Sequence, residues 1–272
     1  MHSCRKNGGK MKRLHYGMPT LIETRTLEEC TKLCAGLGLD FIELNMNLPQ
    51  YQLPRIDVDY FKSIAEQYGI YYTVHLDENL NVCDFNPYVA EAYIKTVADT
   101  VELAKQLNIN VLNMHMAKGV YFTLPDRIVL LFSEYKEHYL KSIVAFRDLC
   151  ETVIGESDIK ICIENCDGYK AFQREAIELL LKSPVFALTF DVGHDHGIGG
   201  VDEFFIMNHK DRLHHIHLHD AKGSKNHLAL GTGEMDIGKY LSLADAHNCR
   251  VVLETKTIDG LKKSVEWIRR NA

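Results

Sequence analysis

Short apolar runs alternate with longer amphipathic segments along almost the whole chain. The short runs have the length and the β-branched and aromatic content of buried strands, and the longer segments repeat apolar residues with the period of a helix. Strands are predicted at residues 14–18, 41–45, 70–75, 111–115, 159–164, 186–191, 213–219 and 251–254, with helices between them, for example over 89–107 and from residue 176. Eight such units in 272 residues favour one parallel (β/α)₈ barrel, a TIM barrel, over an open doubly wound sheet.

Glycine or asparagine stands between several of the predicted helices and the next strand. These residues suit helix C-caps, and they are Gly36, Gly38, Gly69, Asn108 and Asn248. No G-x-G-x-x-G pattern follows the first strand, which weakens the alternative of a nucleotide-binding sheet.

We see no linker or low-complexity segment that would divide the chain. Residues 14–272 are therefore predicted to form one barrel, and residues 1–13 a loose tail. The longest connection runs from residue 115 to residue 159, and it has room for a lid over the site.

Composition sets limits on the function. A formal net charge of -6 gives no support to sequence-independent binding of nucleic acid, although bound cations can invert a local field. The 8 cysteines include no C-x-x-C pair and are expected to be reduced core thiols of a cytoplasmic protein. The basic N-terminus lacks the apolar segment of a signal peptide, and no apolar run approaches the about 18 residues that a membrane span needs.

The polar residues that could carry chemistry gather where the predicted strands end. Strands three to six end at His75, at His115, at Glu164 and at Asp191, the seventh carries His215, His217 and His219, and the eighth ends at Glu254. In a parallel barrel these positions converge on the C-terminal face, where active sites lie. Carboxylates and imidazoles that meet there are best satisfied by a divalent cation.

Each of these residues also has an ordinary structural explanation. A single histidine at a strand end is more often a hydrogen-bonded structural residue than a ligand, and this explanation is the better one for His75 or His115 taken alone. A lone carboxylate at the same place can cap the following helix. The set as a whole falls at six consecutive strand ends, and that regularity favours metal binding.

The types of ligand indicate which metals would fit. Three carboxylates and one imidazole form an oxygen-rich site that suits Mn²⁺, Mg²⁺ or Co²⁺ better than a structural zinc. His75 and His115 would add a second, nitrogen-rich position that suits zinc. Glu164 could bridge the two positions.

Residues two apart on the seventh strand share one face. His215, His217 and His219 therefore point together, while Ile216 and Leu218 point toward the helices. Only the histidine at the right height can bind a metal, and the spacing alone does not say which one that is.

At these residues the chain resembles the xylose isomerase-like TIM-barrel superfamily, which includes sugar and sugar-phosphate isomerases and epimerases as well as endonuclease IV-type AP endonucleases. The resemblance runs from Leu14 to the last helix, and the stretches that carry it are GLDFIEL, ICIEN, FDVGH, HIHLHD, LGTGEMD and VLET. In the epimerase-like members the residues that match Glu164, Asp191, His217 and Glu254 bind one metal, and the two glutamates form the acid-base pair. The resemblance therefore selects His217 on the seventh strand and leaves His215 inside the barrel.

Endonuclease IV-type enzymes use three zinc ions, and their ligands match the same four positions together with His75, His115, His194 and His227. Lys225 stands where that family has an aspartate ligand, and the segments that contact DNA have no counterpart here. Ketose 3-epimerases in turn carry an arginine where this chain reads Lys225-Asn226-His227.

The resemblance implies a divalent-metal-dependent isomerase or epimerase of a small sugar, polyol or sugar phosphate, with Glu164 and Glu254 as catalytic residues. One or two ions of Mn, Co, Mg or Zn are expected as the cofactor, and a small-molecule carbohydrate as the partner. His194, His227 and Lys222 are assigned to the substrate or to a further metal. An AP endonuclease-like phosphodiesterase is the alternative, a related dehydratase is compatible, and a non-catalytic ligand-binding barrel ranks last. Homo-oligomer formation is left open.

Overall fold

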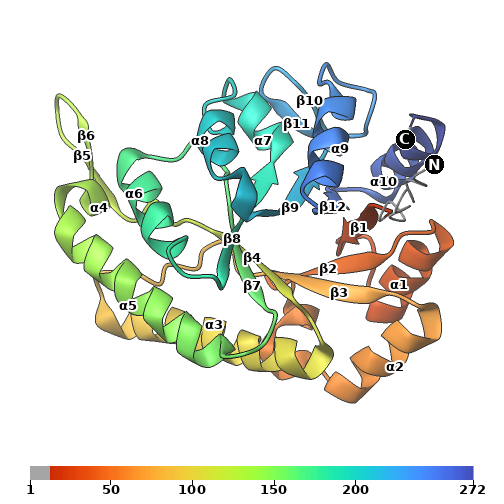
Figure 1. Ribbon diagram of the computed structural model, residues 1–272, viewed down its shortest axis with the longest axis horizontal. Coiled ribbons are helices and arrows are strands. Elements are labelled where there is room, and N and C mark those ends of the chain that lie inside the picture. Colours follow the sequence, from red (N-terminus) through yellow and green to blue (C-terminus); the bar gives the residue numbers. More distant parts are fainter. Residues whose placement is uncertain (1–12, 272) are drawn as a thin grey trace, which may run out of the picture.

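The computed structural model describes residues 13–271, and in it eight parallel strands close into a barrel (Figure 1). Around the barrel the strands follow the order β1-β12-β9-β8-β7-β4-β3-β2. Their bounds are β1 His15–Pro19, β2 Phe41–Asn45, β3 Tyr71–His75, β4 Val111–His115, β7 Lys160–Glu164, β8 Phe186–Asp191, β9 Leu213–Leu218 and β12 Arg250–Leu253. The predicted TIM barrel is confirmed.

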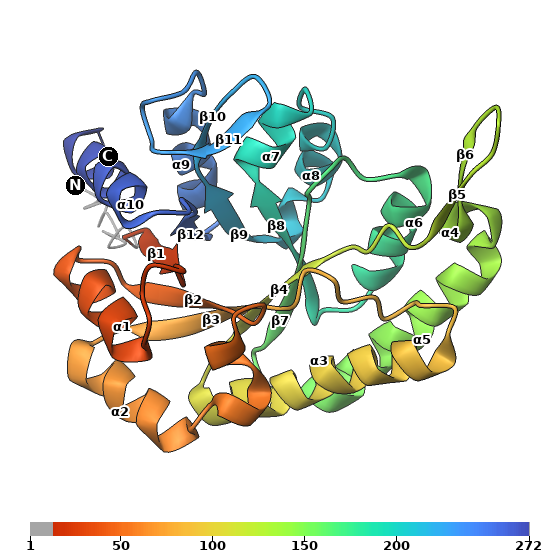
Figure 2. The same ribbon diagram turned by 180° about the vertical axis from the view of Figure 1, so that it is seen from behind.

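Helices surround the strands in Figures 1 and 2, and most of them return the chain from one strand to the next. The helices are α1 Leu27–Gly36, α2 Val58–Tyr68, α3 Pro87–Leu107, α4 Leu131–Glu134, α5 Lys136–Ile154, α6 Ala171–Leu180, α7 Val192–Gly197, α8 Glu203–Asn208, α9 Ile237–Ala246 and α10 Ile258–Asn271. Polar side chains accept a backbone N–H at the start of several of them, as Thr26, Asp57, Asn86 and Asp236 do. These caps satisfy amides that a helix leaves unpaired.

The helix ends agree with the predicted caps at four of five positions. Gly38, Gly69, Asn108 and Asn248 have the left-handed backbone that such caps require. Gly36 was wrongly placed among them, because it is the last residue of α1 and the cap that follows it is Leu37 with a right-handed backbone.

The strand registers place polar residues of adjacent strands at matching heights. Asp191 pairs with His217 across β8 and β9, and His115 pairs with Glu164 across β4 and β7. Further from the C-terminal face, Val111, Cys162 and Ala187 form a small apolar cluster apart from the main core. The main core lies largely between the strands and the surrounding helices, so the polar side chains inside the barrel are held by closely packed walls.

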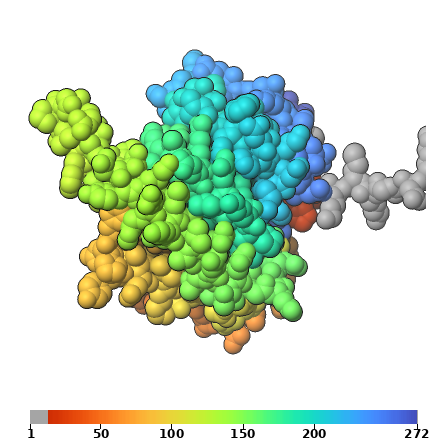
Figure 3. Space-filling model, turned by 60° about the vertical axis from the view of Figure 1, so that its left-hand side comes forward, coloured from red at the N-terminus to blue at the C-terminus, as the bar shows by residue number. Residues whose placement is uncertain are grey.

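The long connection after β4 contains a hairpin that was not predicted as such. Strands β5 Tyr121–Thr123 and β6 Ile128–Leu130 form an antiparallel pair, which stands clear of the body of the molecule at the upper left of Figure 3. A second hairpin, β10 Asp220–Lys222 and β11 Lys225–Leu228, follows β9 at the C-terminal face.

The tail that was predicted over residues 1–13 lies outside the described residues except for Arg13. Among residues 13–271, no helix is long and apolar enough to cross a membrane. The seven cysteines in this part of the chain are free thiols.

Candidate metal centre

Three carboxylates and one imidazole converge at the C-terminal end of the barrel. Glu164 ends β7, Asp191 ends β8, His217 lies in β9, and Glu254 follows the last residue of β12. One potential ligand atom from each lies within 4.8 Å of the others. Their exposed fractions are only 1%, 0%, 0% and 7%, respectively. The chain therefore gathers four metal-type ligands from four strands in a buried space.

The two nitrogens of His217 face different groups. Nδ1 lies 3.1 Å from Glu164 Oε1 and 3.3 Å from Glu254 Oε2, whereas Nε2 lies 2.8 Å from Glu43 Oε1. A neutral imidazole whose proton is on Nε2, toward Glu43, would direct the Nδ1 lone pair at the other carboxylates. A carboxylate behind a histidine is the usual way of fixing the tautomer of a metal ligand.

Asp191 caps a helix with one oxygen and turns the other toward the cluster. Its Oδ1 accepts the backbone N–H of His194 at 2.7 Å and so caps α7. Its Oδ2 lies 3.9 Å from Nδ1 of His217 and faces the cluster. The capping explanation for this residue is thus correct for Oδ1, while Oδ2 faces the cluster with Nδ1 of His194 at 3.2 Å and Nε2 of His219 at 3.3 Å.

Glu164 turns its two oxygens toward two different groups of histidines. Oε1 faces His217, while Oε2 lies 3.4 Å from Nε2 of His75 and 3.2 Å from Nε2 of His115. The Nδ1 of His75 is 2.8 Å from the carbonyl oxygen of Leu76, to which its N–H donates. That bond leaves the Nε2 lone pair free for a ligand position. The geometry is that of a carboxylate shared between two neighbouring sites, of which the second contains His75, His115 and Glu164.

Opposite charges keep these buried groups ionised. Burial raises the pKa of Glu164, but the charges of His217 and His115 outweigh burial and hold it well below its usual range. Burial raises the pKa of Glu254 too, and His217 with Lys256 lowers it well below its usual range. Burial lowers the pKa of His217, but Glu164, Glu43 and Glu254 raise it well above its ordinary value.

This donor set fits a divalent cation. Three buried carboxylates surround a single imidazole, and Oε2 of Glu254 has no hydrogen-bond partner although it is buried. A buried acceptor without a partner costs stability unless an ion or water satisfies it. Mixed oxygen and nitrogen ligands suit Mn²⁺, Co²⁺ or Mg²⁺ at the four-residue position and zinc at the position with two histidines.

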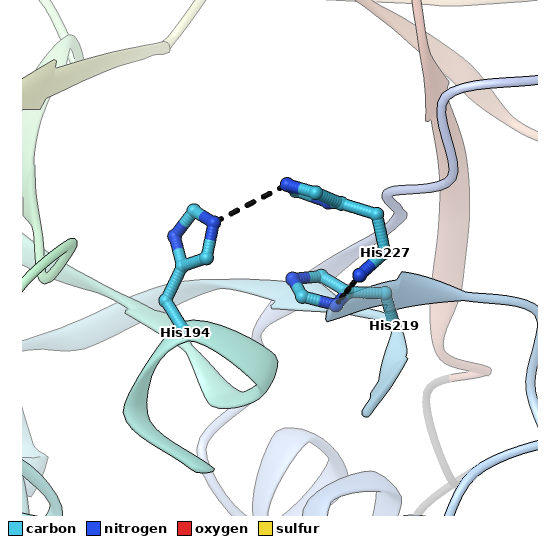
Figure 4. Close-up of side chains that lie close together, drawn as sticks. All are labelled: His194, His219 and His227. Carbon is cyan, nitrogen blue, oxygen red and sulfur yellow. Dashed lines mark hydrogen bonds between the residues drawn. The ribbon is translucent and has the colours of Figure 1, made fainter. Parts of the chain in front are cut away.

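His194 and His227 lie beside each other, as Figure 4 shows, and they approach Asp191 and Glu254 of this centre, respectively. Their Nε2 atoms are 3.2 Å apart, and Nδ1 of His227 lies 3.1 Å from the carbonyl oxygen of Glu254. Burial lowers the pKa of His227 to about 4, so that its imidazole is neutral around pH 7. Lys222 and Lys225 are exposed on the β10–β11 hairpin. The structure thus brings both histidines to the centre and places the two lysines at the surface.

Three further residues at the centre were not singled out as site residues from the sequence. Glu43 lies beneath His217 and accepts a hydrogen bond from Nε2 of His215 at 2.9 Å. The Nζ of Lys256 lies 2.7 Å from Oε1 of Glu254. His219 lies 3.1 Å from Asp191 Oδ1 through its Nε2. Only the alternation along the seventh strand could have indicated His219, and nothing local marks Glu43 or Lys256, because their partners are distant in sequence.

Two small cavities flank the centre. One, of about 270 Å³, is lined by residues that include Asn45, Asn47, Glu254 and Lys256. The other, of about 240 Å³, is lined by residues that include His115, Glu164, Asp167 and Lys118. A larger cavity of about 650 Å³ lies at the opposite end of the barrel beside Tyr16 and Leu37, away from the face on which barrel active sites are found. The cavities beside the centre are of a size for small polar molecules.

Comparisons with known proteins agree with this architecture. A family model described as a xylose isomerase-like TIM barrel matches residues 31–271. The uncharacterized protein MJ1311 of Methanocaldococcus jannaschii is 26% identical over 271 residues, which cover 94% of this chain and 88% of that protein.

Solved structures with the same fold include proteins of different activities. A D-tagatose 3-epimerase-like protein superposes with a TM-score of 0.77 at 21% identity, covering 94% of this chain and 96% of that one. The IolI protein with a bound zinc atom gives 0.71 at 16% identity, with coverages of 94% and 97%. Endonuclease IV from Thermus thermophilus gives 0.65 at 16% identity, with coverages of 94% and 99%. At these identities the similarity establishes the fold alone.

Proposed function

Because this chain belongs to the xylose isomerase-like TIM-barrel family, we propose that it is a divalent-metal-dependent isomerase or epimerase of a small sugar, polyol or sugar phosphate. The observation that carries the proposal is the position of Glu164 and Glu254. Their carboxylates lie 3.1 and 3.3 Å from the same nitrogen of His217. Of two carboxyl groups beside one metal position, the ionised one can serve as the base and the protonated one as the acid of a proton transfer.

Glu164, Asp191, His217 and Glu254 would hold the metal. When bound, a divalent cation supplies Lewis-acid polarisation of a substrate carbonyl and its neighbouring hydroxyl. Glu254 takes a proton from the adjacent carbon, the C–H electron pair moves toward the carbonyl, and an enediolate results. For this step Glu164 would have to carry a proton, which it would give to carbon either on the other face or at the neighbouring position; in the second case the hydroxyl proton would also move to the former carbonyl oxygen. The first outcome is epimerisation and the second is isomerisation.

The charges around Glu254 suit a base of this kind. Lys256 lies 2.7 Å from Oε1 of Glu254, while Oε2 faces the imidazole. The ammonium group would keep the carboxylate ionised before proton transfer, and it would also stand next to a substrate oxygen in the cavity that Asn45 and Asn47 line. The polar lining of this cavity suits the hydroxyl groups of a carbohydrate.

We assign the other predicted site residues to the surroundings of this centre. His75 and His115 would hold a second ion together with Glu164, and His194 and His227 would contact the substrate or a further metal. Lys222 is exposed on its hairpin, so we propose it only for a substrate long enough to reach the barrel rim.

An endonuclease IV-like phosphodiesterase acting on abasic DNA is the second candidate. The observation that favours it is that His75 and His115 both lie beside Oε2 of Glu164. Two ions that share one carboxylate suit phosphodiester hydrolysis. The small cavities beside the centre and the net charge of -6 favour a small substrate instead.

Solvent deuterium exchange tests the proposal. Metal-loaded protein would be incubated in D₂O with ketoses, inosose-like compounds and their phosphates, and NMR would follow the carbon-bound protons. The proposal expects metal-dependent deuterium incorporation into at least one compound. If none of them exchanges with fully loaded protein, and abasic duplex DNA is cleaved, the phosphodiesterase replaces the isomerase.

A further inference from the structure

Both ring nitrogens of His219 are engaged, and they face two different parts of the site. Nδ1 accepts the backbone N–H of His227 at 2.8 Å, a bond drawn in Figure 4. Nε2 lies 3.1 Å from Oδ1 and 3.3 Å from Oδ2 of Asp191. The residue is fully buried. A single side chain therefore connects a candidate metal ligand to the β11 strand that carries His227.

The hydrogen bond from His227 fixes the tautomer of His219. A backbone amide can only donate, so Nδ1 must present its lone pair. The proton of the neutral imidazole then sits on Nε2, which donates it to the carboxylate of Asp191. A nitrogen of His219 comes close enough to His194 and His227 for the three to hold one ion, but neither nitrogen retains a free lone pair. His219 is therefore unsuited to be a ligand, despite its neighbours.

The ring has room only because residue 193 is glycine. A Cβ on Gly193 would stand 2.0 Å from Cε1 and 2.2 Å from Nδ1 of His219. The ring of His227 also packs against that of His219, with the two ring centroids 4.3 Å apart. Gly193 lies in α7, two residues after its N-cap Asp191, so one short segment supplies the carboxylate and the space for the histidine that contacts it.

We propose that His219 is a positioning residue that couples Asp191 to the segment around His227. Its Nε2–H and the backbone N–H of His194 both point at Oδ1 of Asp191, which holds the carboxylate so that Oδ2 faces His217. Its Nδ1 anchors β11 over the same carboxylate. The inference rests on the proposed metal centre, but it concerns binding of the metal and not turnover.

Two substitutions separate the two bonds. In His219→Asn the side-chain oxygen falls near the position of Nδ1 and can accept from His227, but nothing reaches Asp191. In His219→Gln the side-chain NH₂ falls near the position of Nε2 and can still donate to Asp191. Loss of a hydrogen bond behind a ligand typically weakens metal binding by about 10- to 100-fold. We expect that loss in His219→Asn, and an affinity close to wild type in His219→Gln.

The measurements are titration of metal-free protein with Mn²⁺ and with Zn²⁺, and hydrogen exchange of the amides in residues 223–228. His219→Asn should bind metal weakly and keep slow exchange in this segment, whereas His219→Gln should bind metal well and exchange faster there. His214→Asn and His214→Gln are matched controls, since His214 lies on the same strand and outside the metal centre. Thermal unfolding of each metal-free variant shows whether it is folded.

A second pair of variants tests the same inference without changing His219. Gly193→Ala would push the ring out of place and should weaken metal binding as His219→Asn does. Gly197→Ala, in the same helix, meets no atom closer than 3.9 Å and should bind like wild type.

Equal metal affinity in wild type, His219→Asn and Gly193→Ala would overturn the inference while leaving the metal centre intact. Absence of metal binding in the wild-type protein would instead overturn the proposed function on which the inference rests.

Discussion

Oε1 of Glu43 lies 2.8 Å from Nε2 of His217, on the side of the imidazole away from the other carboxylates. Glu43 is nearly fully buried, and its other oxygen takes a hydrogen bond from His215. Burial raises the pKa of this carboxyl, but the charges of His217 and His215 lower it far below its usual value. The contact between Glu43 and His217 holds the imidazole in one orientation. Strand β2 contributes no metal ligand in our assignment, but through Glu43 it takes part in the centre.

We predict that Glu43→Gln weakens metal binding by about 10- to 100-fold, because the amide retains an acceptor but loses the charge that orients and polarises His217. Calorimetric titration with Mn²⁺ or Zn²⁺ measures the effect. Glu66→Gln is the control, since Glu66 is exposed on α2 and lines neither cavity beside the centre. An unchanged affinity in Glu43→Gln would show that the contact has no role in holding the metal.

Removal of metal should lower the stability of the protein. A ligand that binds only the folded state stabilises it by about 2.7 kcal/mol when its concentration is 100 times Kd. Chelator-treated protein should therefore melt at a lower temperature, and added Mn²⁺, Co²⁺ or Zn²⁺ should restore the wild-type melting temperature. Elemental analysis of the purified protein gives the independent check, and a protein that contains no metal and does not respond to these ions would refute the centre.

The number of ions per chain should be one or two. Glu164 can be shared between the four-residue group and the His75–His115 pair, whereas His194 and His227 lack the carboxylate that endonuclease IV-type enzymes supply at the position of Lys225. Metal analysis after dialysis against Zn²⁺ would measure the stoichiometry. Three tightly bound ions together with efficient cleavage of abasic DNA would reverse the order of the two proposed functions. In that case Lys225→Asp should raise occupancy of the third position further.

Lys256 should control the acidic limb of the pH-rate profile. Burial raises the pKa of Glu254, and the charge of Lys256 is one of the influences that lower it. Lys256→Met removes this charge, so the pKa of Glu254 rises and activity should be lost at a higher pH as the solution is acidified. Lys262→Met, on the exposed side of α10, should leave the profile unchanged. A Lys256→Met profile that superposes on wild type would contradict the role of this lysine.

The alternation of apolar runs was sufficient to predict the barrel, because buried parallel strands and their crossover helices differ strongly in length and period. Strands β2, β4 and β8 have the predicted bounds, while β9 ends at Leu218, one residue before His219. The position of candidate ligands at strand ends followed from the same reasoning, since the carboxyl ends of parallel strands share one face of a barrel.

The contacts behind the candidate ligands could not be predicted from the sequence. Glu43 and His217 are far apart in the sequence, and only the barrel closure brings them together. His219 has the same strand parity as His217, but its tautomer depends on the path of β11, which no periodic pattern encodes. The β5–β6 hairpin was missed for a related reason, since each of its strands has only three residues.

The central claim is that Glu254 acts as a base at a metal-bound site, and Glu254→Gln tests it most directly. Glutamine keeps the size and one ligating oxygen but cannot accept the proton, and general base catalysis contributes about 10²- to 10⁴-fold. The measurement is the rate at which a carbon-bound proton of an identified substrate exchanges with D₂O, with the metal content determined in the same sample. The account predicts a folded variant that retains metal and has lost exchange by a factor in that range. Exchange at the wild-type rate in metal-loaded Glu254→Gln would contradict it.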